Sequence, residues 1–324
     1  MRALQVQKLE GPEGLALVEV PEPEAGDGVL IDVVAAGVSF PDLLLSRGQY
    51  QLKPPLPFIP GVEVAGVVRQ APAGAPVRVG DRVMAFMMLG GFAEVAAVPV
   101  EMVFRVPERW SFEAAAGAVM NYHTAHFALH RRGRLKKGEV VLVHGAAGGV
   151  GTATVQVARG AGARVLAVVS DTAKAEVARR AGADEVLLST GDWVQQVREK
   201  TDGRGADVVM DPVGGDIFDR SLKCLAPEGR LLVVGFAGGR IPEVAVNRLL
   251  LRNIDVVGVA WGSFLMHEPG LIATIAKELE ALAAQGFVNP LVGPTYPLEQ
   301  GAQALRDLEQ RRATGKVVLR IRPG

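Results

Sequence analysis

The stretch that decides the fold is residues 140–151, Val-Val-Leu-Val-His-Gly-Ala-Ala-Gly-Gly-Val-Gly. Five residues typical of a buried strand lead directly into a glycine-rich turn, and a helical segment follows. This succession predicts a dinucleotide-binding turn, in which Gly148 allows the backbone to approach a pyrophosphate and Gly151 allows the helix to pack tightly on the strand. Ala146 takes the place of the first glycine in the strict G-x-G-x-x-G pattern.

The free amides at the start of that helix are expected to face the phosphates. The residues expected to contact them are Ala147, Gly148, Gly149, Val150 and Gly151. A tight structural turn is the alternative explanation for such a pattern. The surrounding sequence favours nucleotide binding, because the turn lies within a long alternation of strands and helices.

From about residue 120 onward, strand patterns alternate with helical patterns. Strands are expected at 140–144, 164–169, 185–188, 207–210, 230–235 and 255–259, with helices near 150–160, 172–182, 191–201, 215–225 and 245–252. Alternation of this kind predicts an α/β domain with a six-stranded, doubly wound parallel sheet. We expect this cofactor domain to span residues 121–261.

The rest of the chain has a different pattern. Short β-rich runs separated by Gly and Pro, at 3–7, 16–20, 29–36, 63–68, 81–86 and 93–98, predict a compact, barrel-like β domain over residues 1–120. After about residue 262, an amphipathic helix at 270–285, a helix at 298–312 and a strand at 316–321 break the strand–helix rhythm. A length of 324 residues agrees with two domains.

Composition excludes several classes of function. Equal numbers of acidic and basic residues, 35 each, give no support for binding nucleic acid. The single cysteine, Cys224, excludes an internal disulfide framework and a Cys-rich zinc site. The N-terminus shows no secretory signal, and the longest uncharged stretch, 140–158, is interrupted by glycines and polar residues. We therefore expect a cytoplasmic protein with no membrane or nucleic-acid partner.

The end of the second expected strand bears on the choice between NAD and NADP. NAD-binding domains place an acidic residue there for the ribose 2′-hydroxyl. In this chain that position is Val169, and Ser170 and Lys174 are suited to a 2′-phosphate. Asp171 would favour NAD if its side chain pointed at the ribose. On balance these residues favour NADPH over NADH.

Three histidines, His123, His126 and His130, are spaced so that they could share one face of a helix. A metal site would require all three rings to converge. We interpret them instead as ordinary polar residues of a helix that enters the cofactor domain, and His144 as a buried structural histidine.

Taken together, the sequence resembles the zinc-free quinone oxidoreductase branch of the medium-chain dehydrogenase/reductase superfamily. The matching stretches lie in order along nearly the whole chain. They are GVSFPDLLLSRGQY (37–50), PPLPFIPGVEVAGVV (54–68), VGDRVMAF (79–86), GGFAEVAAVP (90–99), NYHTAHFAL (121–129), VHGAAGGVG (143–151), DPVGGDIFDRSL (211–222), GRLLVVGFAGG (229–239) and ATGKVVLRI (313–321).

The resemblance implies a GroES-like β-barrel catalytic domain, formed by residues 1–120 and completed by 262–324, and a Rossmann cofactor domain. Zinc-dependent relatives have a catalytic Cys in the segment matching 37–42 and Gly-His-Glu at 61–63. This chain has Ser39 and Gly61-Val62-Glu63. Without the thiolate and imidazole ligands, the resemblance implies a protein that contains no zinc.

The resemblance also implies a set of site residues. Asn121 and Thr124 are expected to contact the nicotinamide, and Gly235 and Phe236 the ring or ribose. Asp42 and Lys316 are expected to lie near the cofactor, Asp42 as a catalytic residue and Lys316 as a cofactor-binding one. Ser39 occupies a position at which relatives often have an Asn that shapes the cleft. Tyr50 matches a tyrosine that is thought to donate a proton in related 2-enoyl thioester reductases. Some NADPH-specific relatives have a Tyr near the position of Ser189 that contacts the 2′-phosphate, and this chain lacks it.

Three functions follow as expectations from this resemblance. The first is hydride transfer from NADPH to a quinone or a similar electron-poor acceptor. The alternatives are a 2-enoyl thioester or alkenal reductase of the same fold, and a non-catalytic NADPH-binding protein. The family expectation for assembly is a homodimer.

Overall fold

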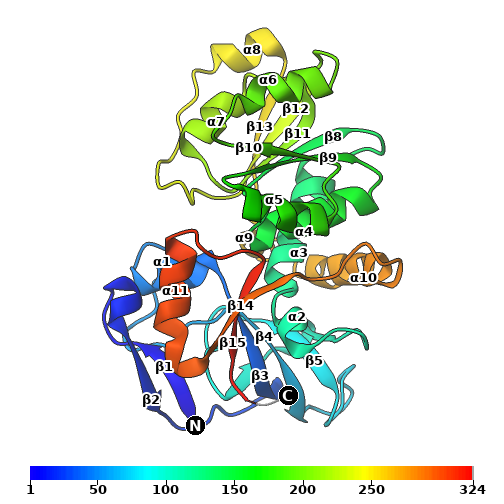
Figure 1. Ribbon diagram of the computed structural model, residues 1–324. Coiled ribbons are helices and arrows are strands. Elements are labelled where there is room, and N and C mark those ends of the chain that lie inside the picture. The colour runs from blue at the N-terminus through cyan, green and yellow to red at the C-terminus, as the bar shows by residue number, and fades with distance from the viewer. Residues whose placement is uncertain (323–324) are drawn as a thin grey trace. The chain divides into compact units, whose positions relative to one another are not determined.

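The computed structural model describes residues 1–322, which form two compact units. The first contains residues 1–120 and the C-terminal segment from Pro290, and the second is Asn121–Asn289. Each unit has its own sheet and its own core (Figure 1).

The first unit is a mostly antiparallel β structure. Its strands are β1 (Arg2–Val6), β2 (Leu15–Glu19), β3 (Val29–Val38), β4 (Glu63–Gln70), β5 (Arg82–Phe86), β6 (Val95–Val98), β7 (Val103–Arg105), β14 (Val292–Pro297) and β15 (Lys316–Arg320). Its helices are α1 (Phe40–Ser46), α2 (Phe112–Ala116) and α11 (Gly301–Glu309), with short 3₁₀ turns at Gly11–Gly14, Val100–Met102 and Leu298–Gln300.

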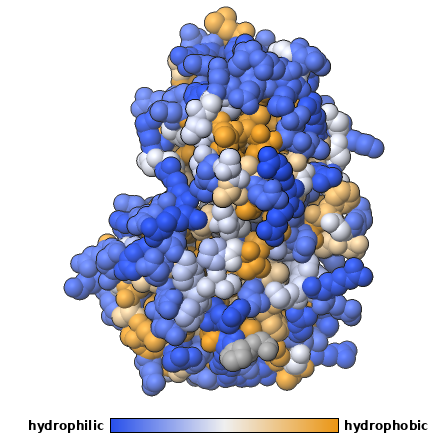
Figure 2. Space-filling model, in the orientation of Figure 1, coloured by the Kyte–Doolittle hydropathy of each residue, from blue (hydrophilic) through white to orange (hydrophobic). Residues whose placement is uncertain are grey.

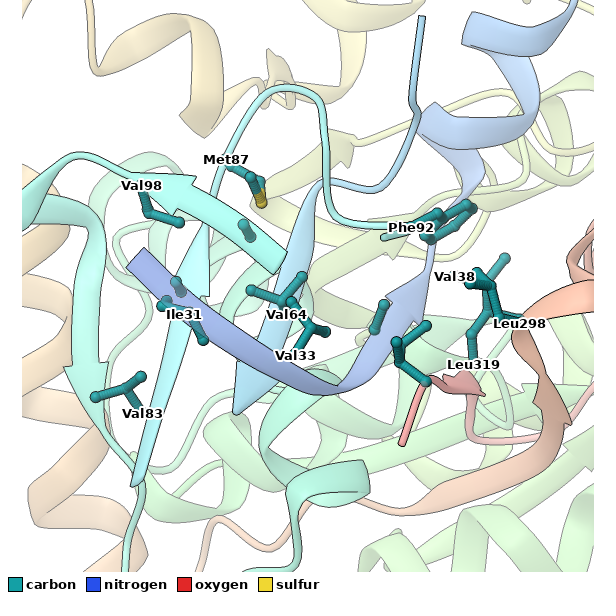
Figure 3. Close-up of a cluster of buried hydrophobic side chains, with 14 of the residues drawn as sticks. Ile31, Val33, Val38, Val64, Val83, Met87, Phe92, Val98, Leu298 and Leu319 are labelled. Atoms are coloured by element: carbon teal, nitrogen blue, oxygen red, sulfur yellow. The ribbon is translucent and has the colours of Figure 1, made fainter. Parts of the chain in front are cut away.

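The strands of this unit pair in the order β14-β15-β3-β4-β5-β7, with β6 also on β3 and with β1-β2 as a separate hairpin. The long strand β3 is buried over most of its length. Its apolar side chains meet those of β4, β5 and β15 in one core, and Figure 3 shows Ile31 and Val33 beside Val64. The expected GroES-like barrel is confirmed, with β7 and β14 as strands that the sequence pattern did not reveal.

Helix α3 (Val119–His126) leads into the second unit and continues into a π-helical turn at Phe127–Arg132. Its strands are β8 (Val140–His144), β9 (Arg164–Val169), β10 (Glu185–Leu188), β11 (Ala206–Asp211), β12 (Leu225–Val233) and β13 (Asp255–Gly258). Its remaining helices are α4 (Gly149–Gly160), α5 (Thr172–Ala181), α6 (Trp193–Lys200), α7 (Gly215–Ser221), α8 (Asn247–Arg252), α9 (Trp261–Phe264) and α10 (Leu271–Ala284).

All six strands of the second unit are parallel and pair in the order β10-β9-β8-β11-β12-β13. This confirms the doubly wound sheet, whose order reverses between β8 and β11. Figure 1 shows α4 and α5 on one face of the sheet and α6 and α7 on the other. Strands covered on both faces need continuous apolar sequence, and every residue of β8 and β11 is buried.

The sequence misplaced the end of the second unit and both ends of β12. The second unit extends to Asn289, whereas the expected domain ended at residue 261. Helix α10 packs closely on α4 at Gly160, where an added Cβ atom would lie only 2.7 Å from the Leu282 side chain. The side chain of Gln156 donates to the carbonyl of Asn289 at 2.8 Å and accepts from its N–H at 2.8 Å. Strand β12 ends at Val233, not at Gly235, and begins earlier, at Leu225.

No helix within residues 1–322 is long and apolar enough to cross a membrane.

Inside the second unit, His144 is buried at the end of β8. Its Nε2 lies 2.8 Å from Ser221 Oγ, and Ser221 donates its own proton to the carbonyl of Ile217. His144 Nε2–H must therefore be the donor to Ser221. Burial lowers the pKa of His144 to about 3, and the ring of Trp193 lies against it at 4.8 Å.

We predict that His144→Gln makes the protein less sensitive to acid. A folded-state pKa below the unfolded value of about 6.5 gives stability that is present at neutral pH and lost as the pH falls below that value. The loss approaches about 1.4 kcal/mol for each pH unit below about 6.5. Urea unfolding at pH 7.5 and 5.5 should show a drop about 1 kcal/mol smaller in the variant.

Replacement of the exposed His267 by Gln is the matched control and should leave the pH dependence as in the wild type. Equal drops in wild type and His144→Gln would show that His144 does not contribute to acid unfolding.

Candidate functional site

The expected site residues form two groups, one in each unit. In the second unit, the glycine turn follows β8 as predicted. Gly145 adopts a φ of +58°, and the N–H of Gly148 donates to the carbonyl of Gly145 at 2.9 Å. A Cβ at Gly151 would lie 2.1 Å from the carbonyl oxygen of Gly145, so only glycine allows α4 to start this close to the strand.

The N-terminus of α4 has no side-chain cap at Gly148. The first amides of a helix have no acceptor within the helix, so those of Gly149, Val150 and Gly151 remain available to a ligand. Twelve residues of helix also direct a partial positive charge to this end. The turn therefore fits the pyrophosphate of a dinucleotide, with Ala147 buried beneath it.

Helix α3 brings Asn121 to this turn. A Cβ at Gly149 would lie 2.5 Å from Asn121 Nδ2, so the absence of a side chain at Gly149 makes room for the amide. Thr124 is one turn further along α3, and both polar side chains are buried. The structure thus places two residues expected at the nicotinamide on the helix that packs beside the glycine turn.

At the end of β9, Ser170 and Lys174 lie together. Lys174 Nζ donates to Ser170 Oγ at 2.9 Å, and Ser170 donates to Asp171 Oδ2 at 2.8 Å. Asp171 does not stand free for a ribose, because its Oδ1 accepts the backbone N–H of Lys174 at 2.9 Å and caps α5. A hydroxyl and an ammonium are therefore the groups available to a 2′-phosphate here.

Gly235 and Phe236 follow the end of β12. The Phe236 ring packs on the turn after β11, since a Cβ at Gly214 would lie 3.0 Å from Phe236 Cδ1. That turn is held by Asp211, whose Oδ1 accepts the backbone N–H groups of Val213 and Gly214 at 2.8 and 2.9 Å. The ends of β8, β9, β11 and β12 thus all carry segments expected to bind the cofactor.

In the first unit, Ser39, Asp42 and Lys316 form one buried cluster together with Glu63. Lys316 Nζ donates to Ser39 Oγ at 2.7 Å and to Glu63 Oε1 at 2.5 Å, and Glu63 Oε2 accepts the N–H of Met120 at 2.9 Å. These side chains come from the ends of three neighbouring strands, because β15 pairs with β3 and β3 with β4.

Asp42 fixes the backbone on the other side of Ser39. Its Oδ2 accepts the N–H of Ser39 at 2.8 Å, and its Oδ1 accepts the N–H of Gly61 at 2.9 Å. Complete burial raises the pKa of Asp42 to about 7, against the effect of these donors and of the Lys316 charge. Asp42 therefore holds the segments before α1 and before β4 together.

Tyr50 lies apart from these hydrogen bonds. Its ring is half-buried and packs against Val6, Leu45 and Phe58. Burial, together with the charge of Asp42, raises the pKa of the Tyr50 hydroxyl. The phenol therefore stays protonated at neutral pH in an apolar setting.

Sequence reasoning missed Glu63 as a site residue. It is fully buried and is the partner of Lys316. The signal was present in the sequence, because Glu63 is the only charged residue among the apolar residues at the start of its strand, 62–68. A buried carboxylate needs an opposite charge or several donors, so such a residue predicts a buried partner but does not identify it.

A zinc ion does not fit this cluster. Protein zinc sites use thiolate, imidazole or carboxylate ligands. Here the Ser39 hydroxyl and the Lys316 ammonium lie beside the Glu63 carboxylate, which is already paired with Lys316. Across residues 1–322, no three His, Cys, Asp or Glu side chains are grouped as a metal site requires. We therefore derive no chemical step through zinc.

The three histidines of α3 and its π-helical continuation do not converge. His126 Nε2 lies 2.7 Å from Glu278 Oε2 of α10, and the rings of His126 and His130 are 4.4 Å apart. The His123 ring packs instead on Trp261 at 5.4 Å. Burial lowers the pKa of His126 to about 3. His126 and His123 therefore serve to pack α3 against α10 and α9.

Comparisons with known proteins agree with this arrangement. The alcohol dehydrogenase GroES-like domain model matches residues 25–108, and the zinc-binding dehydrogenase model matches residues 149–278. The chain is 38% identical to rat (Rattus norvegicus) quinone oxidoreductase-like protein 2 over 325 residues, covering 99% of this chain and 92% of the relative.

Two solved structures are similar over nearly their whole lengths. A probable oxidoreductase from Mycobacterium abscessus is 46% identical, with a TM-score of 0.90 and 99% of each chain covered. The quinone oxidoreductase from Thermus thermophilus, solved alone and in complex with NADPH, is 37% identical, with a TM-score of 0.84 and coverage of 99% of this chain and 100% of the other.

Identity at this level over nearly the whole chain agrees with the two-unit fold and with the turn after β8. The chain belongs to the quinone oxidoreductase branch of the medium-chain dehydrogenase/reductase superfamily.

Proposed function

We propose that this protein is an NADPH-dependent quinone oxidoreductase that works without zinc, as a cytoplasmic homodimer. The observation that carries the proposal is the uncapped N-terminus of α4 behind Gly148, with a serine and a lysine at the end of the neighbouring strand. Bound NADPH would supply a hydride to the acceptor. The chain's own residues bind and orient the reactants.

Each group of residues has a proposed role in binding. The amides of Gly149, Val150 and Gly151 hold the pyrophosphate, and Ser170 and Lys174 hold the 2′-phosphate. To do so, Lys174 exchanges its weak contact with Asp171, 3.5 Å away, for the phosphate. Asn121 and Thr124 of α3, and Gly235 and Phe236 after β12, are the proposed contacts of the nicotinamide and ribose.

The proposed acceptor is a quinone, a planar molecule that needs an apolar surface and no protein acid. The half-buried Tyr50 ring, packed on apolar residues, offers such a surface. A second candidate, reduction of a 2-enoyl thioester or alkenal, is favoured by the same residue, because a phenol whose pKa is raised stays protonated and can donate.

The homodimer is proposed to form at the edge of the six-stranded sheet. Strand β13 is an edge strand, and an unpaired edge is a template for pairing with another chain. The segment before it exposes Ile241, Val246, Leu250 and Leu251, each more than two-thirds exposed. Figure 2 shows hydrophobic surface where α8 lies in Figure 1. A second copy related by a two-fold axis would cover both features.

We predict that Lys174→Ala weakens NADPH binding by about 1.5–3 kcal/mol, the scale of a charge-assisted hydrogen bond. NADH binding should change little, because NADH lacks the 2′-phosphate. Fluorescence titration with each cofactor measures the two effects. Lys200→Ala removes a lysine that pairs with Glu185 in the same unit and is the matched control. Equal losses for NADPH and NADH would give Lys174 only a structural role.

Acceptor preference tests the proposed reaction directly. The loss of NADPH absorbance is followed with a 1,4-quinone, an ortho-quinone, a 2-enoyl thioester and an alkenal. We expect rapid turnover with the quinones. Faster turnover with the thioester would indicate an enoyl reductase. In that case Tyr50→Phe is expected to lower the activity. Tight NADPH binding without turnover of any acceptor would favour a non-catalytic NADPH-binding protein.

The double substitution Leu250→Glu/Leu251→Glu should convert the dimer to a monomer, because it places four charges at the paired surface of two copies. Light scattering after size exclusion gives the mass. Val79→Glu, at an exposed valine of the first unit, is the control and should remain dimeric. A wild-type protein that runs as a monomer at micromolar concentration would refute the proposed assembly.

A further inference from the structure

The cluster of Lys316, Ser39 and Glu63 contains a hydroxyl whose proton is not needed by its neighbours. An ammonium group only donates hydrogen bonds, so Ser39 Oγ must accept from Lys316 Nζ at 2.7 Å. The Ser39 proton therefore points elsewhere. Ser39 Oγ donates it to Glu63 Oε1 at the long distance of 3.2 Å.

That contact is a poor hydrogen bond for the Ser39 proton. Hydrogen bonds between a hydroxyl and an oxygen usually measure 2.5–3.0 Å. Glu63 Oε1 already accepts the charge-assisted bond from Lys316 at 2.5 Å, and Glu63 Oε2 accepts the N–H of Met120. Glu63 keeps these two donors without Ser39, so the Ser39 proton can leave its long contact with Glu63 for a ligand oxygen.

The surrounding backbone is shaped to hold this arrangement. A Cβ at Gly37 would lie 2.8 Å from Glu63 Cγ, and a Cβ at Gly117 would lie 2.6 Å from Lys316 Cγ. Two glycines thus leave the space that the ion pair occupies. The N–H of Ser39 is bound by Asp42, so both the backbone and the side chain of Ser39 are fixed.

We infer that Lys316 positions the Ser39 hydroxyl as a hydrogen-bond donor to the oxygen of the electron acceptor, and that this pair stabilises the negative charge formed there on reduction. The inference rests on the proposed function and describes how the same site treats its acceptor. It also replaces the expected role of Lys316 in binding the cofactor, because the ammonium already has two partners in the first unit.

The chemistry requires no bond to form or break in the protein. A quinone that receives a hydride, which is two electrons and one proton, from a reduced nicotinamide becomes a hydroquinone monoanion, and water supplies the second proton. Ser39 keeps its proton and Lys316 keeps its charge throughout. The fixed Ser39 hydroxyl dipole, held by the Lys316–Glu63 ion pair, acts in a buried setting, where such a donor stabilises an oxyanion far more than it would in water.

Ser39→Ala removes the donor and should lower kcat by about 100-fold, the effect of losing one oxyanion donor. The loss should grow with the basicity of the hydroquinone oxygen across a series of substituted quinones. NADPH affinity should be unchanged. Ser46→Ala is the matched control, because it removes a buried hydroxyl of α1 that donates to the carbonyl of Leu43.

Lys316 is tested without leaving a charge unpaired. Lys316→Met/Glu63→Gln removes both charges together, so folding is preserved better than in Lys316→Met alone. If Lys316 acts through Ser39, adding Ser39→Ala to this pair should cause little further loss of kcat. Arg230→Met/Glu139→Gln, which removes a largely buried ion pair of the second unit, is the control for packing effects and should keep wild-type kcat.

Binding of 4-nitrophenolate gives a measurement independent of turnover. This anion resembles the reduced acceptor, and its absorption band reports hydrogen bonding to its oxygen. We expect weaker binding and a smaller band shift in Ser39→Ala and in Lys316→Met/Glu63→Gln. Wild-type kcat in Ser39→Ala, an equal loss for every quinone, or fully additive losses would each overturn the inference while leaving the proposed function intact.

Wild-type turnover is measured first, because it separates the two claims. A wild-type protein that reduces no quinone, thioester or alkenal would refute the proposed function, and the inference would fall with it.

Discussion

The buried ion pair between Lys316 and Glu63 is the interaction on which the first unit depends. It joins the last strand of the chain to β4, across β3, and it places a charge where water does not reach. Removing one partner of such a pair typically costs about 3–5 kcal/mol, because the other charge is left buried without compensation. The surroundings of the pair meet this requirement. Ser39 and the Met120 N–H supply hydrogen bonds to the two charged groups, and Gly37 and Gly117 leave the space that their side chains fill.

The second unit depends on a steric constraint instead. Helix α4 begins so close to β8 that a Cβ atom at position 151 would clash with the carbonyl oxygen of Gly145. This approach directs uncapped amides beyond the edge of the sheet where the parallel strands end, and Ser170, Lys174 and Phe236 follow neighbouring strands to the same edge. The two units therefore offer fixed hydrogen-bond donors of two kinds, the amides at the start of a helix and a serine hydroxyl held by a buried ion pair. In the proposed function, the first serves the phosphates and the second the acceptor.

Much of this architecture was predictable from local sequence patterns. The bounds of β8, β9 and β10 match their predicted ranges, because buried parallel strands require continuous apolar residues between turn signals. Strand β14 was not predictable, since Gly293 and Pro294 obscure its pattern and its pairing with β15 alone defines it. The domain boundary at Asn289 depends on hydrogen bonds from Gln156, which no local pattern reveals.

By itself, the sequence determined the fold class, the family and the position of the glycine turn, because periodicity and glycine placement act over a few residues. Only the tertiary structure decided which polar side chains meet. Ser39, Glu63 and Lys316 are separated by up to 277 residues, and the pairing of three strands brings them within hydrogen-bond distance. It likewise decided that Asp171 caps α5, because a side chain's direction depends on the backbone geometry at the helix start.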